Sequence, residues 1–535
     1  MSHLTMISGR AVLRILSGAV VATSAFVAST TQAAVPGITG GATTAPIFNL
    51  TASADYNSQP DGASIYSWGY GCTRTPAGFL PAAVIGSAGP AATCPLMQRP
   101  GPTMIVTQGD KVTVTLTNGL PRAAGNTSIV FPGFQVCAAT LNSDGTCTGT
   151  PTGVPGLLAQ EATKGNTVTY TFTAPNPGTY SYHSGTQPDL QIEMGLSGAI
   201  VVLPAAATIG CTKGRYSNAS SAYNHPETCY DREYLFQFSE MSSMIHDQVK
   251  AQIDACSDSQ ATACPPIVTT MEPYHPNYFL INGRSMPDLM DTSYSASYVH
   301  QPYNGNPHMH PGERVLMRVV GQGRWQHPFH FHGNHARVLA RDAGLLTVQN
   351  DTQTPARLAG PLLFTIATVS GQTVDAIFTW TGQGLNWDVY GLQNTIPVAG
   401  AAPVVHTCKG KNAVDVNGRN KFTSPSSSYD PTSSGFDGST HEYCLDHGKP
   451  IPATPPDPSI VVNGQWYGGT PYIGLQAANP TPEAPGTLNQ NPQAGYAYMW
   501  HSHNEREITT NDVFPGGMMM MLLIDPFTWF IDETL

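Results

Sequence analysis

The chain has 535 residues and a formal net charge of −11, and only 11% of its residues are charged. This length allows about two to four domains, and the charged fraction lies well below the roughly 25% of an average globular domain. The negative charge disfavours a phosphate backbone and therefore excludes nucleic acid as a partner. With 53 glycines, 45 prolines and many Val/Thr/Ile runs, the composition predicts an all-β architecture with many turns.

The first segment, residues 1–33, has the pattern of a secretory signal peptide. Arg10 and Arg14 precede the apolar stretch Ile15–Ala28, and Thr31-Gln32-Ala33 places small residues at the usual cleavage spacing. Its apolar core is too short for a stable membrane span, and no later stretch approaches the required length of about 18 apolar residues. We therefore expect an exported protein, in the periplasm, at the cell surface or outside the cell, without a membrane span in the mature chain.

Ten cysteines follow this segment, an even number that suits an exported protein with disulfide bonds. They fall as close neighbours along the chain, while no Cys-x-x-Cys spacing occurs and no cysteine lies beside a histidine motif, which disfavours a metal–thiolate site. Pairing of sequential neighbours predicts five disulfides, namely Cys72–Cys94, Cys137–Cys147, Cys211–Cys229, Cys256–Cys264 and Cys408–Cys444.

Two parts of the chain repeat one pattern, in which a Gly-containing turn and an alternating strand are followed by a strand that ends in His and by a final apolar strand. The first part has these features at 109–117, His183 and 198–204, and the second has them at 312–320, His501 and 518–524. Short alternating strands of this kind build Greek-key β-sandwiches.

The repeat predicts a domain organisation with two β-sandwich domains. The expected bounds are 34–205 for the first domain, 206–231 for a connector stapled by a disulfide, and 232–535 for the second domain. A segment rich in Ser, Pro, Gly and Asn at about 400–495 interrupts the second domain. Loops of this length are usually functional, so it would cover a site or contact a partner, unless it is a decorated surface loop.

Three histidine stretches carry the candidate chemistry: His327–Gly333, Met499–His503 and Tyr182–Gly185. In an extended strand, residues two apart point to one face, so His330 pairs with His332 and His501 pairs with His503. Neutral imidazoles that converge on one point suit copper best, with zinc and iron as alternatives. A hydrogen-bonded histidine cluster without metal is the competing interpretation.

These stretches resemble the copper motifs of the multicopper oxidase superfamily. His327-Pro328-x-His330-x-His332-Gly333 is similar to the third motif, His501-x-His503 to the fourth, and Tyr182-His183-Ser184 to the second. The resemblance implies a two-domain protein with cupredoxin-like domains. The chain is also similar to bacterial oxidase-like proteins associated with manganese oxidation.

The resemblance implies a role for each histidine. His330 would bind the type 2 copper, and His327 would be the type 1 histidine. The two type 3 coppers would be bound by His332 with His501 and by His183 with His503.

The sequence departs from the family pattern at several positions. Ser502 stands where the family has the cysteine of the type 1 site, and Glu507 stands where it has the next type 1 histidine. Gly185 replaces another family histidine, and the segment 128–134 contains no His-x-His-Gly motif. A type 1 site needs the thiolate, so we expect this site to be absent and about one to two copper ions to be bound by the five remaining histidines.

Secondary candidates lie near these motifs. His308 and His310 form another His-x-His pair, which is either a surface copper-loading site or, because no third ligand is visible, a pair without a metal. Glu507, with Glu505 and Asp512, would bind a hard cation or belong to a solvated loop. His335 is expected in packing or beside a ligand. The run Met518–Met521 is expected to pack in the core rather than bind copper.

The sequence favours a copper-dependent oxidoreductase that acts on a reduced metal ion or a small phenol with oxygen. A non-catalytic copper protein for storage, delivery or tolerance is the alternative, and a structural role in surface assembly is a third. Two-domain relatives often form trimers with metal between subunits, so the resemblance allows a homo-oligomer. Whether His183 and the other four histidines meet within one chain or between chains stays open at this point.

Overall fold

The computed structural model describes residues 35–41, 44–81, 94–205, 209, 211, 220–256, 263–382, 494–525 and 531, together with the strand segments 395–398, 401–405, 436–437, 442–443 and 469–473. The predicted signal peptide and most of the predicted insertion lie outside these residues. No helix in the described part of the chain is long and apolar enough to cross a membrane.

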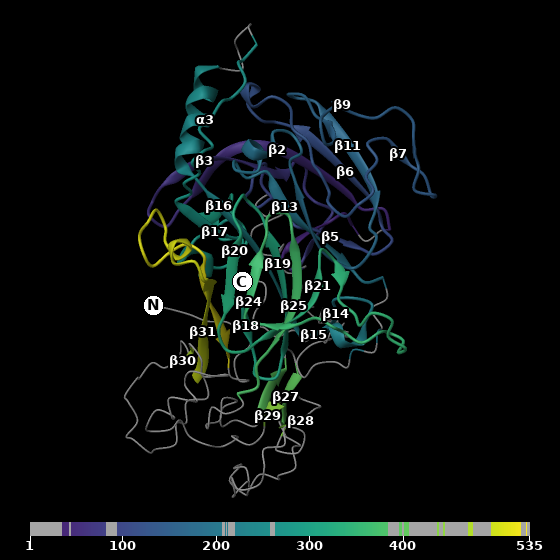
Figure 1. Cartoon of the computed structure of the whole chain (residues 1–535), viewed down its shortest axis with the longest axis vertical. Coiled ribbons are helices and arrows are strands. Elements are labelled where there is room, and N and C mark those ends of the chain that lie inside the picture. The colour runs from purple at the N-terminus through teal and green to yellow at the C-terminus, as the bar shows by residue number, and fades with distance from the viewer. Residues whose placement is uncertain are drawn as a thin grey trace, which may run out of the picture. The chain divides into compact units, whose positions relative to one another are not determined.

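Strands between residues 37 and 203 form two larger sheets and two short two-stranded ones, at 140–148 and 154–161 (Figure 1). The four-stranded sheet has the order β11-β6-β2-β3, and the five-stranded sheet has the order β12-β13-β5-β1-β4. Their bounds are β1 (Gly37–Thr39), β2 (Ile47–Ser58), β3 (Ser64–Cys72), β4 (Gly78–Leu80), β5 (Met104–Thr107), β6 (Lys111–Asn118), β11 (Thr167–Thr173), β12 (Gly178–His183) and β13 (Ser197–Leu203).

The alternating strands of the four-stranded sheet bury one face each. In β6 and β11, Val112 lies opposite Phe172 and Val114 lies opposite Tyr170, and all four side chains are buried. They share one core with side chains of the five-stranded sheet, including Tyr182 of β12. The two sheets therefore pack face to face as a β-sandwich.

A second pair of sheets follows from residue 232 onward. The seven-stranded sheet has the order β17-β16-β19-β25-β21-β22 with β23 beside β21, and the six-stranded sheet has the order β18-β32-β31-β20-β24 with β30 beside β31. Their bounds are β16 (Arg232–Met241), β17 (Tyr278–Ile281), β18 (His308–Met309), β19 (Arg314–Gly321), β20 (His327–Phe331), β21 (Ala336–Arg341), β22 (Gly344–Leu345), β23 (Leu362–Leu363), β24 (Thr365–Thr368), β25 (Thr373–Thr379), β30 (Gly469–Ile473), β31 (Ala494–Ser502) and β32 (Met519–Ile524).

Aromatic side chains fill the space between these two sheets. Phe238 of β16 packs on Phe329 of β20 at 4.9 Å between ring centroids, and Phe329 packs edge-on against Trp500 of β31 at 6.0 Å. Met520 of the methionine run is fully buried in the same core, as expected for that strand. The prediction of an all-β fold with two β-sandwiches is confirmed, while the residue bounds of the two domains stay predictions.

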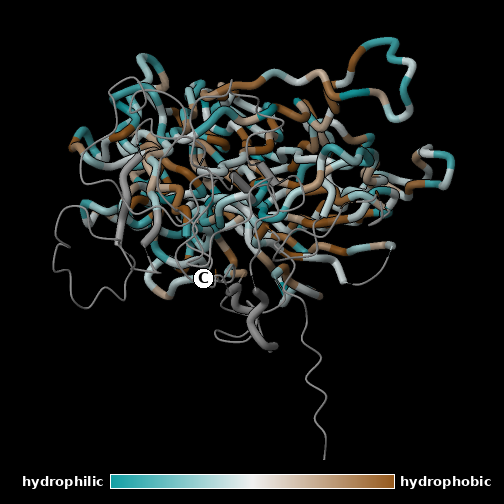
Figure 2. Tube along the Cα trace, turned by 90° about the horizontal axis from the view of Figure 1, so that it is seen from below, coloured by the Kyte–Doolittle hydropathy of each residue, from teal (hydrophilic) through white to brown (hydrophobic). Residues whose placement is uncertain are grey.

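Short elements complete the described structure. Hydrophobic segments are concentrated among the packed strands, and hydrophilic segments occur in several outer loops (Figure 2). The remaining elements are β7 (Thr140–Leu141), β8 (Cys147–Thr148), β9 (Val154–Pro155), β10 (Gln160–Glu161), β14 (Ser220–Ser221), β15 (Cys229–Tyr230), β26 (Thr395–Val398), β27 (Ala401–Val405), β28 (Phe436–Asp437), β29 (Glu442–Tyr443), α2 (Pro188–Gln191), α3 (Ser243–Ala255), η2 (Arg122–Ala124), η3 (Pro226–Thr228), η4 (Asp288–Met290), η5 (Ala296–Tyr298) and η8 (Glu505–Ile508).

Helix α3 is an element that the composition did not predict. Ile245 and Val249, four residues apart, lie on one face of α3 and are buried in the core of the first sandwich. Spacing of three or four residues between apolar side chains is the helical pattern. The helix stands beside β3 (Figure 1) and attaches the segment that follows β16 to the first sandwich.

Four of the five predicted disulfides are confirmed. Sulfur atoms are bonded in Cys72–Cys94, Cys137–Cys147, Cys211–Cys229 and Cys256–Cys264. The fifth predicted pair, Cys408–Cys444, lies outside the described residues. Each confirmed bond closes a short loop, as the close spacing of neighbouring cysteines predicted.

Candidate metal centre

The register of two neighbouring strands brings the histidines of the second sandwich together. β20 and β31 are antiparallel, with His330 directly opposite His501. Side chains opposite each other in such a pair lie on the same face of the sheet. His332 follows the end of β20 and His503 follows the end of β31, each two residues further on the same face. Phe329 and Phe331, which alternate with these histidines, are buried in the core.

Three of these side chains place their ligand atoms in one small volume. The ligand nitrogens of His330, His332 and His501 all lie within 4.8 Å of one another. His501 Nε2 and His332 Nε2 are 3.3 Å apart. The exposed ring of His503 lies 4.9 Å from that of His330 and 5.6 Å from that of His501. The four side chains form a group that we call the four-histidine cluster.

Neighbouring groups hold the rings of His501 and His330 in place. The backbone carbonyl of Ser502 lies 2.7 Å from His501 Nδ1 and accepts a hydrogen bond, which requires the proton on Nδ1 and leaves the lone pair on Nε2. His330 Nδ1 lies 2.8 Å from Thr365 Oγ1 on β24. Phe364, before β24, packs edge-on against His330 at 5.6 Å.

Burial and the neighbouring imidazoles favour the uncharged forms of His330 and His501. Burial lowers the pKa of His330 to about 4, and the nearby imidazoles of His332, His501 and His503 act in the same direction. Burial also lowers the pKa of His501. Neutral imidazoles are the form that binds metal, and a set of three or four converging imidazoles fits copper.

His183 is separate from this cluster within the chain. It ends β12 in the first sandwich, paired with Ser197 and bridged to Val130. Among the described residues, the group of converging ligand atoms does not include His183. Its Nδ1 lies 3.0 Å from the carbonyl of Ser184, and the side chain is half-buried. Within one chain, the predicted group of five histidines is therefore incomplete, because His183 does not join the other four.

His327 lies apart from the cluster, although it belongs to the same motif. Its ring is fully buried between two carboxylates, with Nε2 2.9 Å from Glu240 Oε2 and Nδ1 2.9 Å from Glu507 Oε2. Burial by itself lowers the pKa of His327, but the two carboxylates outweigh it and raise the pKa to about 9. Nε2 is hydrogen-bonded to Glu240 and Nδ1 faces the Glu507 carboxylate at ion-pair distance, so the structure does not support the prediction of His327 as a copper ligand.

Glu507 also differs from its predicted role. The sequence left open whether Glu507 binds a hard cation or belongs to a solvated loop, but its side chain is fully buried against His327, Ser502 and Asn504. Glu505 and Asp512, the other two acids, are exposed, and Asp512 lies 3.5 Å from Arg506. The structure does not support a cation site formed by these three acids.

The pair His308 and His310 is held by carboxylates of its own. His308 Nδ1 lies 2.6 Å from Asp525, and His310 Nδ1 lies 3.2 Å from Glu313. Among the described residues, no group of three or more converging ligand atoms includes His308 or His310, so the surface copper-loading site stays a prediction. His335 is exposed and packs on Phe364 at 5.1 Å, which agrees with the packing role expected for it.

No sequence pattern identified Glu240, Thr365 or Phe364 as neighbours of the histidines. Glu240 lies 87 residues before His327 along the chain, and Thr365 lies 35 residues after His330. The alternation of polar and apolar residues in β16 and β24 was the available signal, and it does not identify which polar side chain reaches a histidine.

Comparison with known proteins supports the resemblance to multicopper oxidases. Two family models, each described as multicopper oxidase, match residues 96–207 and 270–384. The iron transport multicopper oxidase FET3 of Saccharomyces cerevisiae is 38% identical over 107 residues, which is 20% of this chain and 15% of that protein. Laccase-3 of Botryotinia fuckeliana is 36% identical over 119 residues, or 22% of this chain and 23% of that protein. The matched part spans less than a quarter of either relative.

Solved structures with a similar course of the chain include the multicopper oxidase mgLAC, with a TM-score of 0.42, 15% identity and coverage of 91% of this chain and 87% of that chain. A blue copper oxidase from Nitrosomonas europaea has a TM-score of 0.42, 15% identity and coverage of 89% and 85%. The family matches and the two sandwiches together confirm the predicted cupredoxin-like domains. With copper motifs at the strand ends and two matches to the same family, this chain belongs to the multicopper oxidase superfamily, whose cofactor is copper.

Proposed function

We propose that the protein is an exported, copper-dependent oxidoreductase without a type 1 copper site, which oxidises a reduced metal ion or a small phenol with oxygen. The observation that carries this proposal is the four-histidine cluster, in which the ligand nitrogens of His330, His332 and His501 lie within 4.8 Å of one another. Copper bound there would supply a one-electron redox change.

The chain's own residues hold and expose this centre. His330 and His501 bind from directly opposed strand positions, and the carbonyl of Ser502 keeps Nε2 of His501 directed at the metal. His503 is exposed, so a small substrate reaches the centre from solvent. The exposed ring of Phe364 beside His330 offers an apolar surface that suits an aromatic substrate.

The proposed absence of a type 1 site rests on three positions. Ser502 supplies a hydroxyl instead of a thiolate, and its Oγ donates to Glu507 at 2.5 Å. Glu507 occupies the place of a histidine, and His327 is held by two carboxylates. A site of the blue type needs a thiolate and two free imidazoles. Electrons would therefore enter directly at the four-histidine cluster.

The same three positions favour one alternative function. A non-catalytic copper protein for storage, delivery or tolerance needs ligands but no separate electron-entry site. The confirmed disulfides support export for either function, because such bonds persist in oxidising compartments.

Copper content and spectra of the purified, copper-loaded protein test the proposal. We expect about one to two copper ions per chain, an electron paramagnetic resonance signal from imidazole-bound copper, and no intense band near about 600 nm, because the thiolate that causes it is missing. Oxygen uptake is then measured with Mn(II), Fe(II), Cu(I) and phenols. Oxygen consumption that depends on copper supports the oxidoreductase, and stoichiometric copper without oxygen consumption supports the alternative. An intense blue band or a protein without copper would contradict the proposal.

We also propose that His183 completes the metal site of a neighbouring copy in a homo-oligomer, such as a trimer. Exposed apolar side chains follow or precede the histidine segments in both sandwiches. Leu158, which is 58% exposed, lies against Gly185 near His183, and Leu157 beside it is 91% exposed. Near the four-histidine cluster, Leu362 is 60% and Phe364 53% exposed. Apolar side chains next to incomplete polar sites are typical of surfaces that bind a partner.

Complementation between two variants tests this second proposal. His183→Ala and His330→Ala chains are expected to lose copper when each is prepared alone. After subunit exchange, mixed oligomers regain part of the copper, because a site between chains can take His183 from one copy and His330 from the other. Copper that does not return after verified exchange, or a monomer by analytical ultracentrifugation, would exclude a site shared between chains.

A further inference from the structure

His327 has a carboxylate oxygen at each of its two ring nitrogens. Nε2 lies 2.9 Å from Glu240 Oε2 on β16, and Nδ1 lies 2.9 Å from Glu507 Oε2 on η8. All three side chains are fully buried. The ring of Phe238 lies near one face of the imidazole, at 6.4 Å between centroids.

The number of protons on the ring follows from these contacts. A neutral imidazole has one N–H and one lone pair, so it can donate to one carboxylate only and would turn its lone pair toward the other. A doubly protonated imidazole donates to both. Two buried carboxylates, one hydrogen-bonded to Nε2 and the other at ion-pair distance from Nδ1, therefore favour the imidazolium form, because an unpaired buried charge is costly.

The second oxygens of the two glutamates are held as well. Glu240 Oε1 accepts from the backbone N–H groups of Arg324 and Trp325. Glu507 Oε1 accepts from Asn504 Nδ2 at 2.9 Å. These donors fix both carboxylates on opposite sides of the His327 ring.

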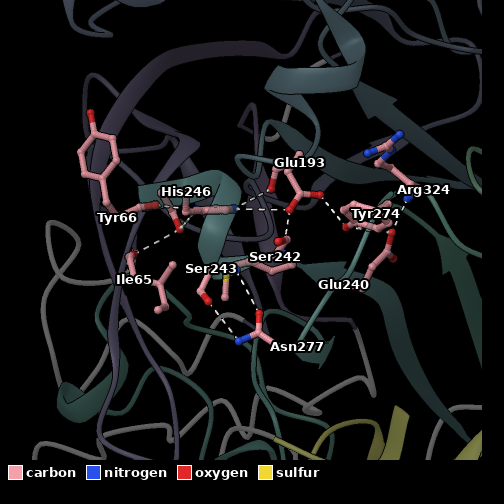
Figure 3. Close-up of polar contacts among 12 residues, drawn as sticks. Ile65, Tyr66, Glu193, Glu240, Ser242, Ser243, His246, Tyr274, Asn277 and Arg324 are labelled. Carbon is pink, nitrogen blue, oxygen red and sulfur yellow. Dashed lines mark hydrogen bonds and ion pairs between the residues drawn. The ribbon is translucent and has the colours of Figure 1, made fainter. Parts of the chain in front are cut away.

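Other titratable groups lie on the Glu240 side (Figure 3). The hydroxyl of Tyr274 lies 3.4 Å from Glu240 Oε1 and donates to Glu193 at 2.6 Å. The buried Arg99 donates to the backbone carbonyls of Glu240 and Glu193. Burial raises the pKa of Glu193 to about 7, so this carboxyl carries a smaller negative charge near neutral pH than an exposed one. The charges that face His327 itself are therefore those of Glu240 and Glu507.

Glu507 is connected to the candidate metal ligands through a hydrogen bond with Ser502. Ser502 Oγ donates to Glu507 at 2.5 Å, and Ser502 stands between His501 and His503 in the chain. Its side chain is fully buried on the face opposite to theirs. Asn504 N also donates to Ser502 Oγ at 3.2 Å. The direction of both histidines thus depends on a residue that Glu507 holds in place.

We propose that His327 is a doubly protonated cation clamped between Glu240 and Glu507, and that this clamp, acting through Ser502, positions His501 and His503 for metal binding. His327, Glu240 and Glu507 are therefore positioning residues. The second half of the proposal rests on the proposed copper-binding function, whereas the first half does not.

Nuclear magnetic resonance of protein with ¹⁵N-labelled histidine tests the first half, with His327→Gln used to assign the signal. We expect both ring nitrogens of His327 to carry protons at pH 7 to 8, where an ordinary imidazole is neutral. The raised pKa means that the stabilisation by the clamp is fully present below about pH 6.5 and is lost as the pH rises through about 9. A single N–H on His327 at pH 7 would overturn this half.

Copper titration of Glu507→Gln tests the second half. The neutral amide weakens the clamp, and we expect copper affinity at the cluster to fall by about 10-fold, with an altered paramagnetic resonance spectrum, as for loss of other groups that orient metal ligands. Glu505→Gln is the matched control, because Glu505 lies on the same short helix but is exposed. Equal copper affinity in the two variants would overturn the positioning role.

Two further measurements keep the outcomes distinct. If Glu507→Gln does not fold, Ser502→Ala removes only the link between the clamp and the strand, and it is expected to lower copper affinity in the same direction; unchanged affinity would overturn the positioning role. If the wild-type protein binds no copper, the proposed function and the positioning role both fail. The resonance measurement then still decides the protonation of His327.

Discussion

Replacing His330 by alanine is expected to reduce copper affinity by more than about 100-fold, because the loss of a ligand exceeds the 10- to 100-fold effect of losing a group that only orients one. His330 is central to the cluster, since its ring lies 4.8 Å from that of His332, 5.5 Å from that of His501 and 4.9 Å from that of His503. His501→Ala, on the opposing strand, is expected to have a similar effect. Isothermal titration with copper measures both.

His335→Ala is the matched control for these variants. His335 lies three residues after His332, is exposed and packs on Phe364 rather than on the cluster. We expect copper affinity close to that of the wild type. Equal copper uptake by His330→Ala, His335→Ala and the wild type would show that the four-histidine cluster is not the copper site and would remove the basis of both proposed functions.

Replacing Arg318 by methionine is expected to lower the free energy of unfolding by about 3–5 kcal/mol, the usual cost of breaking a buried ion pair from one side. Arg318 is fully buried, with Nε 2.5 Å from Glu233 and NH1 3.4 Å from Asp375. Methionine leaves both carboxylates buried without their cation. Since domains are typically stable by roughly 5–15 kcal/mol, this loss is a large part of the total.

Arg318 also joins the two sandwiches. Its NH1 donates to Thr179 Oγ1 on β12, and Thr179 in turn donates to Asp375 on β25 at 2.6 Å. Urea denaturation followed by tryptophan fluorescence measures the change. Arg357→Met is the control, because Arg357 is 60% exposed beside Asp351 and is expected to leave the transition nearly unchanged. Similar midpoints for the two variants would contradict the structural role of Arg318.

The alternating pattern of the sequence was sufficient to predict the β-sandwiches, and the close spacing of cysteines was sufficient to predict four disulfides. Both features depend on residues that are near each other along the chain. The same is true of each His-x-His pair in the four-histidine cluster, because the two-residue period of a strand places both histidines of a pair on one face. Helix α3 also has a local signal, the spacing of Ile245, Val249 and Ile253, which a search for strands passed over.

Tertiary structure alone decided which side chains meet across the sheets. The motif predicted His327 as a copper ligand, but Glu240, 87 residues earlier, and Glu507 on another segment engage both of its nitrogens. His183 also belongs to a motif that resembles the family, but it ends β12, which is part of the other sandwich. Strand register and sheet order depend on the packing of the whole core, and no local pattern reports them. The sequence by itself therefore determined the strands and the type of ligand, while packing determined which histidines form the site.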